Sequence, residues 1–178
     1  MRLKTKILDE VAIKRSLVRI THEIIEKNKG AKDVCLLGVK SRGAPLAVRL
    51  KENIQIFEGV DVPVGYIDVT RHRDDISIEE KQCAKDGCEI PCDLSDKTVI
   101  IVDDVLYTGR TARAALEAVF TYARPKAIQL AVLIDRGHRE LPLKPDYVGK
   151  NVPTSGDEEI AVLVNEIDLQ EGVYILEK

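Results

Sequence analysis

Two adjacent carboxylates and a glycine-containing loop stand together between Val99 and Thr111, in the segment VIIVDDVLYTGRT. Four apolar residues lead into Asp103 and Asp104, and the loop that follows supplies hydroxyls and a flexible backbone. The N–H groups at the start of a following helix would favour a phosphate. Carboxylates repel phosphate but accept hydrogen bonds well from ribose hydroxyls. The segment therefore predicts a sugar-phosphate site, and neither a Walker A loop nor a dinucleotide glycine fingerprint occurs in the sequence.

The acid pair needs an explanation of its own, because an acidic turn after a buried strand would account for only one of the two aspartates. A second signal is Ser41-Arg42-Gly43, which follows the apolar run at 34–39. Arg42 can pair with a diphosphate, and Gly43 lets the backbone approach a ligand. A strand-to-helix turn often carries such residues without any ligand, so this triplet alone indicates little.

The elements that must position these residues alternate along the chain. Apolar spacing predicts a helix over about 10–28, capped by Asp9 and closed by Gly30, and further helices from about 41 to 53 and 111 to 123. Apolar runs predict strands at 34–39, 63–69, 97–102 and 127–134, with weaker ones at 159–164 and 173–176. The alternation predicts a single α/β domain over 1–178, with a mostly parallel central sheet flanked by helices. The charged segment at about 70–96 predicts a flexible loop or mobile hairpin.

Composition restricts the class of protein further. The chain is 44% hydrophobic and 32% charged, without a run of 18 apolar residues, so we expect no membrane span. Residues 1–9 do not resemble a signal peptide, and we expect a cytoplasmic protein. The net charge of −3 argues against a generally basic nucleic-acid binder but permits a local basic patch. The spacing of Cys83, Cys88 and Cys92 matches no common zinc site, so we expect these cysteines to be free thiols, and the sequence does not indicate their role.

The segment at 99–111 resembles the motif that binds 5-phosphoribosyl-1-pyrophosphate (PRPP) in type I phosphoribosyltransferases. Other segments resemble one subfamily in the same order along the chain: LDE at 8–10, VKSRGAPLA at 39–47, RDD at 73–75, LAVLIDRGHRELP at 130–142 and GKNVPTS at 149–155. That subfamily is the PyrR family, whose members regulate pyrimidine operons by attenuation and are also uracil phosphoribosyltransferases. The resemblance covers essentially the whole chain.

The resemblance implies a type I phosphoribosyltransferase fold with a small hood and a flexible loop. It also implies transfer of phosphoribosyl from PRPP to uracil, giving UMP and pyrophosphate, with Mg²⁺ as cofactor. The Mg²⁺ would be held mainly by PRPP, with no firm protein ligand. Asp103, Asp104 and Arg73 would be the catalytic residues. The implied PRPP and nucleotide site comprises Ser41, Arg42, Gly43, Asp103, Asp104, Val105, Leu106, Tyr107, Thr108, Gly109, Arg110 and Thr111, and the implied base site comprises Ile134, Asp135 and Arg136.

A second implied role is binding of the pyr operon leader mRNA, with UMP or UTP as the signal for transcription attenuation. The expected RNA-binding residues are Arg15, Arg19, His22, His138, Arg139, Lys144 and Lys150. The first three recur on one face of the first helix, but an amphipathic helix always shows solvent a charged face, and Glu23 and Glu26 dilute this one. The charges alone therefore leave the role open. We expect the RNA to contact a homo-oligomer, a dimer or larger.

Two alternative functions remain open. The chain could be a phosphoribosyltransferase for another base with no RNA role, or a nucleotide-sensing RNA-binding regulator with little catalysis. A panel of bases tests the first alternative, and uracil-dependent release of pyrophosphate tests the second. The residues do not distinguish a preference for UMP from one for UTP, and they do not indicate which RNA structure is recognised.

Overall fold

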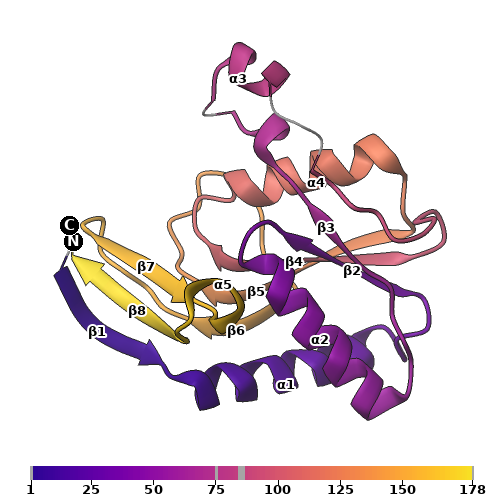
Figure 1. Ribbon diagram of the computed structural model, residues 1–178, viewed down its shortest axis with the longest axis horizontal. Coiled ribbons are helices and arrows are strands. Elements are labelled where there is room, and N and C mark those ends of the chain that lie inside the picture. Colours follow the sequence, from indigo (N-terminus) through magenta and orange to yellow (C-terminus); the bar gives the residue numbers. More distant parts are fainter. Residues whose placement is uncertain (1, 75, 84–86, 178) are drawn as a thin grey trace.

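A five-stranded parallel sheet forms the centre of the molecule in the computed structural model, which describes residues 2–74, 76–83 and 87–177 (Figure 1). Its strands run in the order β3-β2-β4-β5-β6 and are β2 (Val34–Val39), β3 (Val64–Ile67), β4 (Thr98–Leu106), β5 (Ala127–Asp135) and β6 (Tyr147–Asn151). Helices α1 (Glu10–Lys27) and α2 (Gly43–Glu58) cover one face, and α4 (Arg110–Tyr122) covers the other. The predicted α/β fold with helices on both faces is confirmed.

A smaller antiparallel sheet forms a hood beside the main sheet. In the described part of the chain its strand order is β1-β8-β7, and its elements are β1 (Arg2–Leu8), β7 (Glu158–Leu163), α5 (Asn165–Asp168) and β8 (Gly172–Glu177). The two ends of the chain lie side by side at the outer end of this sheet (Figure 1). The strand β1 was not predicted, since most of its side chains are exposed and its partner β8 lies at the other end of the sequence.

Local sequence signals explain the elements that were predicted well. The carboxylate of Asp9 accepts a hydrogen bond from the Ala12 N–H at 2.8 Å, which caps α1 as expected. The apolar stripe of α1 is buried, with Ile13 and Ile24 fully covered. All six residues of β2 are buried, as expected for a strand covered on both faces. No helix among the described residues is long and apolar enough to cross a membrane.

Several element boundaries differ from the predicted ones. Strand β4 continues to Leu106 instead of ending at Val102, since its last residues still pair with β5. Helix α2 continues five residues past Asn53 to Glu58 and ends at Gly59, which has φ 68°. Strand β6 was missed because its polar sequence, YVGKN, lacks an apolar run.

The segment at 70–96 contains more regular structure than a loop. It holds a short 3₁₀ helix, η1 (Thr70–His72), and the helix α3 (Ile78–Cys83). Ser77 and Glu80 cap α3 reciprocally: the Ser77 N–H donates to the Glu80 carboxylate at 2.8 Å, and the Glu80 N–H donates to the Ser77 hydroxyl at 3.2 Å. This capping box is readable in the sequence, and the prediction of an irregular segment overlooked it.

The sheet topology places two loops side by side. From β2 the chain crosses to the edge strand β3, and it then returns to β4 on the other side of β2. The carboxyl ends of β2 and β4 therefore flank the point where the strand order reverses. Open α/β sheets bind ligands in the crevice at such a point. Both motifs singled out in the sequence, at 41–43 and at 103–111, follow these two strands.

Candidate active site

The acid pair lies near the carboxyl end of the central strand β4. Asp103 accepts a hydrogen bond from the Asp104 N–H at 2.9 Å, and Asp104 accepts one from the Val105 N–H at the same distance. Burial raises the pKa of the Asp103 carboxyl well above its ordinary value, and the neighbouring Asp104 raises it further. The pair is thus a site that favours a cation or hydrogen-bond donors such as ribose hydroxyls.

The loop from Leu106 to Gly109 connects the acid pair to α4. Gly109 occupies the N-cap position with φ 93°, a conformation that favours glycine. The Thr108 hydroxyl accepts from the Arg110 N–H at 3.3 Å, and the Thr108 carbonyl accepts from the N–H groups of Glu140 at 2.9 Å and Leu141 at 3.1 Å. Residues 140 and 141 therefore hold the loop in place through the Thr108 carbonyl. The first turn of α4 offers N–H groups that have no acceptor within the helix, and such groups suit a phosphate.

The second loop, Ser41-Arg42-Gly43, meets the acid pair directly. The peptide bond between Lys40 and Ser41 is cis, and Gly43 begins α2. A Cβ added at Gly43 would lie 2.3 Å from the Val102 carbonyl oxygen and 3.2 Å from the Asp103 Cα. Only glycine permits this approach. The structure therefore brings together the three parts that the sequence singled out: the 41–43 loop, the acid pair and the 106–111 loop.

Arg42 has a partner that the sequence did not indicate. Its Nε and Nη2 donate to the two carboxylate oxygens of Asp168 at 3.1 Å and 2.7 Å. The Arg42 guanidinium is the main cause of the lowered pKa of Asp168, and the hydrogen bond from the Val164 N–H also contributes. Asp168 lies on α5 of the hood, 126 residues further along the chain. No local pattern could have connected the two.

The residues that were expected to bind the base lie at the end of β5 and at the start of the loop that follows this strand. Ile134 is buried, and Asp135 accepts from the Gly137 N–H at 2.9 Å and from Arg139 at 2.6 Å. Arg136 is only 7% exposed, and its guanidinium carbon lies 3.8 Å from the centre of the Tyr107 ring. It also donates to the Thr154 hydroxyl at 2.8 Å and to a hood carbonyl. These side chains therefore join β5, the 106–109 loop and the hood.

The start of the 70–96 segment is held against α4. Arg110 forms an ion pair with Asp74 and donates to Glu140 at 2.7 Å, and Arg113 donates to the His72 carbonyl at 2.9 Å. Arg73 follows η1 and is exposed. This arrangement places the start of the predicted flexible loop beside the 106–111 loop. Asp75, also part of the resemblance, and the Cys83 side chain lie outside the described residues.

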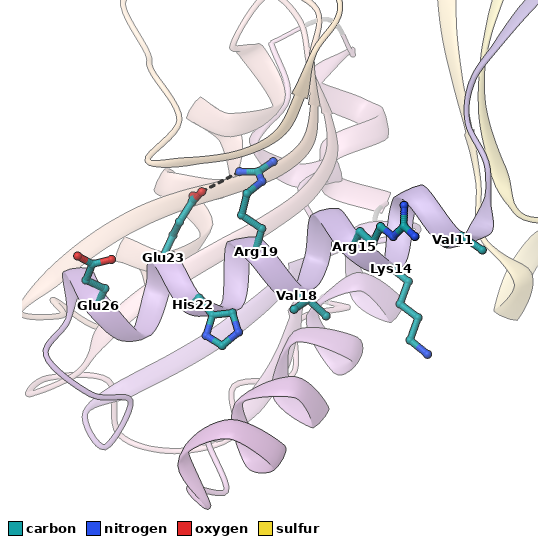
Figure 2. Close-up of a pocket in the computed structure, with 8 residues that line it drawn as sticks. All are labelled: Val11, Lys14, Arg15, Val18, Arg19, His22, Glu23 and Glu26. Atoms are coloured by element: carbon teal, nitrogen blue, oxygen red, sulfur yellow. Dashed lines mark hydrogen bonds and ion pairs between the residues drawn. The ribbon is translucent and has the colours of Figure 1, made fainter.

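Three of the expected RNA-binding residues share one surface. Arg15, Arg19 and His22 lie along the outer face of α1, in a groove whose lining also includes Val11, Lys14, Val18, Glu23 and Glu26 (Figure 2). Arg19 pairs with Glu23 at 2.7 Å, and it also donates to the Val148 carbonyl at 3.1 Å and to that of Gly149. The His22 ring stacks on the Phe57 ring of α2, with 4.4 Å between the ring centres.

The other four expected RNA-binding residues lie elsewhere. The Arg139 guanidinium is occupied within the protein, donating to Asp135, to the Leu143 carbonyl at 3.0 Å and to the Tyr107 carbonyl at 2.8 Å. His138 contacts the Thr154 carbonyl, and its ring lies beside that of Tyr107 in the 106–111 loop. Lys144 is exposed near α4, on the opposite side of the sheet from α1, and Lys150 is exposed on β6. The structure thus groups Arg15, Arg19 and His22 on α1 and does not bring the other four expected residues to them.

Comparison with known proteins agrees with this geometry. A model of the phosphoribosyl transferase domain matches residues 4–166. A hypoxanthine-guanine phosphoribosyltransferase from Bacillus anthracis shares the fold at 20% identity, with a TM-score of 0.73 over 98% of this chain and 99% of that chain. A hypoxanthine phosphoribosyltransferase from Trypanosoma cruzi has a TM-score of 0.74 at 18% identity, covering 99% of this chain and 92% of that one. Fold and site together define a type I phosphoribosyltransferase.

Curated relatives show to which family of phosphoribosyltransferases the chain belongs. A protein named Bifunctional protein PyrR from Clostridium botulinum is 57% identical over 175 residues, which cover 98% of this chain and 97% of the relative. A protein of the same name from Alkaliphilus metalliredigens is 57% identical over 95% of this chain and 93% of its own length. The chain therefore belongs to the PyrR family, and the resemblance seen in the sequence is confirmed.

Proposed function

We propose that this chain transfers the phosphoribosyl group of PRPP to uracil, giving UMP and pyrophosphate. We further propose that it binds the pyr operon leader mRNA when UMP or UTP is bound, and thereby promotes transcription attenuation. The observation that carries the enzymatic part is the acid pair between two loops suited to phosphates. PRPP carries its ribose hydroxyls between a diphosphate and a 5′-phosphate, so its three groups match the three parts of the site.

The reaction exchanges one bond at the ribose. The bond from C1′ to the diphosphate oxygen breaks, and its electron pair leaves with pyrophosphate. A bond from C1′ to uracil N1 forms, and the N1 proton passes to solvent. Positive charge develops on the ribose in the oxocarbenium-like state. The acid pair, with Asp103 ionised once PRPP and Mg²⁺ are bound, would stabilise this charge while accepting from the 2′ and 3′ hydroxyls. Arg42 pairs with the leaving diphosphate, and the 106–111 loop holds the 5′-phosphate. The segment with Arg73 closes the site against water, which would otherwise hydrolyse PRPP.

Mg²⁺ is the proposed cofactor. This cation prefers carboxylate and phosphate oxygens, and the acid pair suits a cation next to the ribose, since burial and the neighbouring Asp104 carboxylate raise the pKa of Asp103. Within the described ranges, no three or more His, Cys, Asp or Glu side chains gather into a metal site. Most of the oxygens around Mg²⁺ would therefore come from PRPP and water. When bound, the cation neutralises charge on the leaving diphosphate.

A panel of bases tests the enzymatic proposal. Purified protein is incubated with PRPP, Mg²⁺ and one of uracil, orotate, hypoxanthine or guanine, and released pyrophosphate and the nucleotide product are measured. We expect product with uracil alone. Turnover of another base in place of uracil would refute the assignment of substrate. Binding of UMP without any turnover would instead favour a nucleotide-sensing regulator.

The α1 surface supports the RNA part of the proposal. Lys14, Arg15, Arg19 and His22 lie on it, beside the acidic Glu23 and Glu26 (Figure 2). Cationic side chains on one surface attract RNA phosphates, and rings such as His22 can stack on bases. The surface also includes the exposed Val11, which would suit contact with another copy of the chain in the proposed homo-oligomer.

A gel shift on the leader mRNA tests this part. We expect UMP to tighten binding and GMP to leave it unchanged. Arg15→Glu should weaken RNA binding without changing kcat/KM for PRPP, because Arg15 lies on α1 away from the acid pair. Arg124→Glu reverses the charge of another exposed arginine, just after α4, and should bind RNA like the wild type. An absence of RNA binding with every nucleotide would refute the RNA role.

A further inference from the structure

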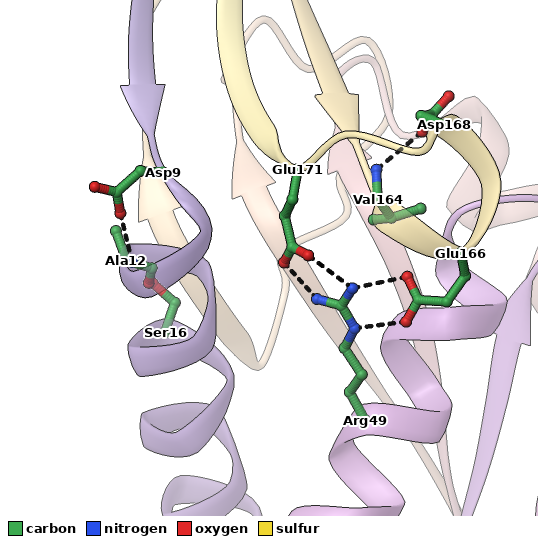
Figure 3. A network of polar contacts seen from close by, with 8 residues as sticks. All are labelled: Asp9, Ala12, Ser16, Arg49, Val164, Glu166, Asp168 and Glu171. Carbon is green, nitrogen blue, oxygen red and sulfur yellow. Dashed lines mark hydrogen bonds and ion pairs between the residues drawn. The ribbon is translucent and has the colours of Figure 1, made fainter.

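The hood and the main sheet are joined by two separate arginine–carboxylate contacts. In the first, Arg49 of α2 forms two-point pairs with Glu166 of α5 and Glu171 before β8, at distances from 2.5 to 3.0 Å (Figure 3). In the second, Arg42 pairs with Asp168. The Arg49 contact already attaches α5 to α2. The Arg42 contact differs because its arginine lies in the candidate diphosphate loop.

The geometry of the second pair leaves part of the arginine available. Asp168 occupies the Nε and Nη2 side of the guanidinium, and Nη1 has no hydrogen-bond partner in the part of the chain that the structure describes. The Asp168 side chain is only 16% exposed, and one of its oxygens also accepts from the Val164 N–H at 2.9 Å (Figure 3). The carboxylate is thus fixed by the backbone of its own element, and it fixes the guanidinium in turn.

We propose that Asp168 is a positioning residue for the diphosphate of PRPP: held by Val164, it orients the Arg42 guanidinium so that Nη1 faces the leaving group. This role rests on the proposed function and adds a hood residue to it. An unpaired arginine samples many rotamers, and ordering it on binding weakens affinity. The pair with Asp168 orders the side chain before the substrate arrives. Because Asp104 also acts electrostatically on Arg42, the oriented cation adjoins the ribose site.

The variant Asp168→Asn tests this role with little change in shape. The amide oxygen can still accept from Val164, but the neutral side chain loses the two-point pair with Arg42. We expect the KM for PRPP and the inhibition constant for pyrophosphate each to rise about tenfold, equivalent to about 1.4 kcal/mol. The affinity for UMP should stay unchanged, since UMP has no diphosphate. Asp168→Glu lengthens the side chain but keeps its charge. Its KM for PRPP and its inhibition constant for pyrophosphate should lie between those of the wild type and those of Asp168→Asn.

Glu166→Gln is the matched control. It neutralises a carboxylate two residues away on the same helix, whose arginine partner, Arg49, lies outside the site and keeps Glu171. This variant should retain wild-type constants for PRPP, pyrophosphate and UMP. Asp168→Glu supplies a second variant if Asp168→Asn fails to fold. Arg42→Lys removes both the two-point pair and the Nη1 donor, so adding Asp168→Asn to Arg42→Lys should cause no further loss, because Asp168 acts only through Arg42.

The possible results distinguish a failure of the positioning role of Asp168 from a failure of the proposed phosphoribosyl transfer. Unchanged PRPP and pyrophosphate constants in Asp168→Asn would overturn the positioning role, as would a lower KM, which would mean that Asp168 competes with the diphosphate. An equal loss of UMP and PRPP affinity would indicate a purely structural role and would also overturn it. Wild-type protein that binds neither PRPP nor pyrophosphate would refute the proposed function itself, before any variant is compared.

Discussion

Replacing Gly43 by alanine tests whether the distance between the 41–43 loop and the acid pair matters. The added Cβ would lie 2.3 Å from the Val102 carbonyl oxygen, with the Asp103 Cα at 3.2 Å. An ordinary carbon–oxygen contact is at least about 3.3 Å, so α2 and β4 must separate by about 1 Å. Both partners are backbone, and Val102 belongs to a buried central strand. Neither can rotate away as a side chain would.

Two magnitudes follow from this displacement. Overpacking a well-packed interior costs about 1–3 kcal/mol, and a backbone contact in a central strand belongs near the upper value. We therefore expect Gly43→Ala to lower the free energy of unfolding by about 3 kcal/mol. Misplacing a reacting group by about 1 Å can lower the rate about a hundredfold. Because Asp103 follows Val102 directly, kcat/KM for PRPP should fall by about that factor.

Urea unfolding and steady-state kinetics measure both quantities. The control is Gly156→Ala, because a Cβ at Gly156 would meet nothing within 4 Å. Its stability should change by no more than about 1 kcal/mol, with normal kinetics. If Gly43→Ala proved as stable as this control, the inferred contact would be wrong. Lost stability with unchanged kcat/KM would refute the link between loop spacing and catalysis.

Three further predictions concern ionisable side chains. Because the pKa of Asp103 is raised, the folded state keeps a proton that the unfolded chain releases, so stability falls as pH rises from the ordinary aspartate range towards the raised pKa. Asp103→Asn should therefore stabilise the free protein at neutral pH and flatten this fall, and equal pH profiles in urea unfolding would contradict the reasoning. Arg139→Gln should lower the free energy of unfolding by about 2 kcal/mol, since it removes a partly buried pair with Asp135 and hydrogen bonds to three carbonyls. Thermal unfolding measures this loss, with the exposed Lys144→Gln as a control that should leave the melting temperature unchanged. Burial raises the pKa of Cys35 to about 12, so iodoacetamide at pH 8 should leave this thiol unlabelled in the folded protein and label it after unfolding, as followed by mass spectrometry. Rapid labelling of Cys35 in the folded state would contradict its burial.

Local signals account for what could be predicted. The cap at Asp9 and the apolar stripe of α1 depend on residues within a few positions of one another, and the structure reproduces both. The acid pair and the loop up to Thr111 are also contiguous, so the same short segment contains the strand end, the turn and the helix start. The class of ligand could therefore be inferred before any fold was known.

Contacts between distant segments account for what could not be predicted. Strand β1 gains its partner only when the two ends of the chain meet, and β6 is a strand because β5 pairs with it. Arg139 had been expected on an RNA-binding surface, but its guanidinium is occupied by three neighbouring segments of the fold. A charged residue in a sequence carries no sign of whether its partner will be solvent or protein.

The sequence by itself determined the alternating elements, the sugar-phosphate motif and the resemblance to PyrR proteins, because each depends on residues that are neighbours in the chain. Only the tertiary structure decided how the parts of the site meet. It set Gly43 against Val102, gave Arg42 its partner Asp168, and separated the basic residues of α1 from those near Tyr107. These relations join residues that are tens to more than a hundred positions apart. They exist only because the packing of the sheet, helices and hood fixes those distances.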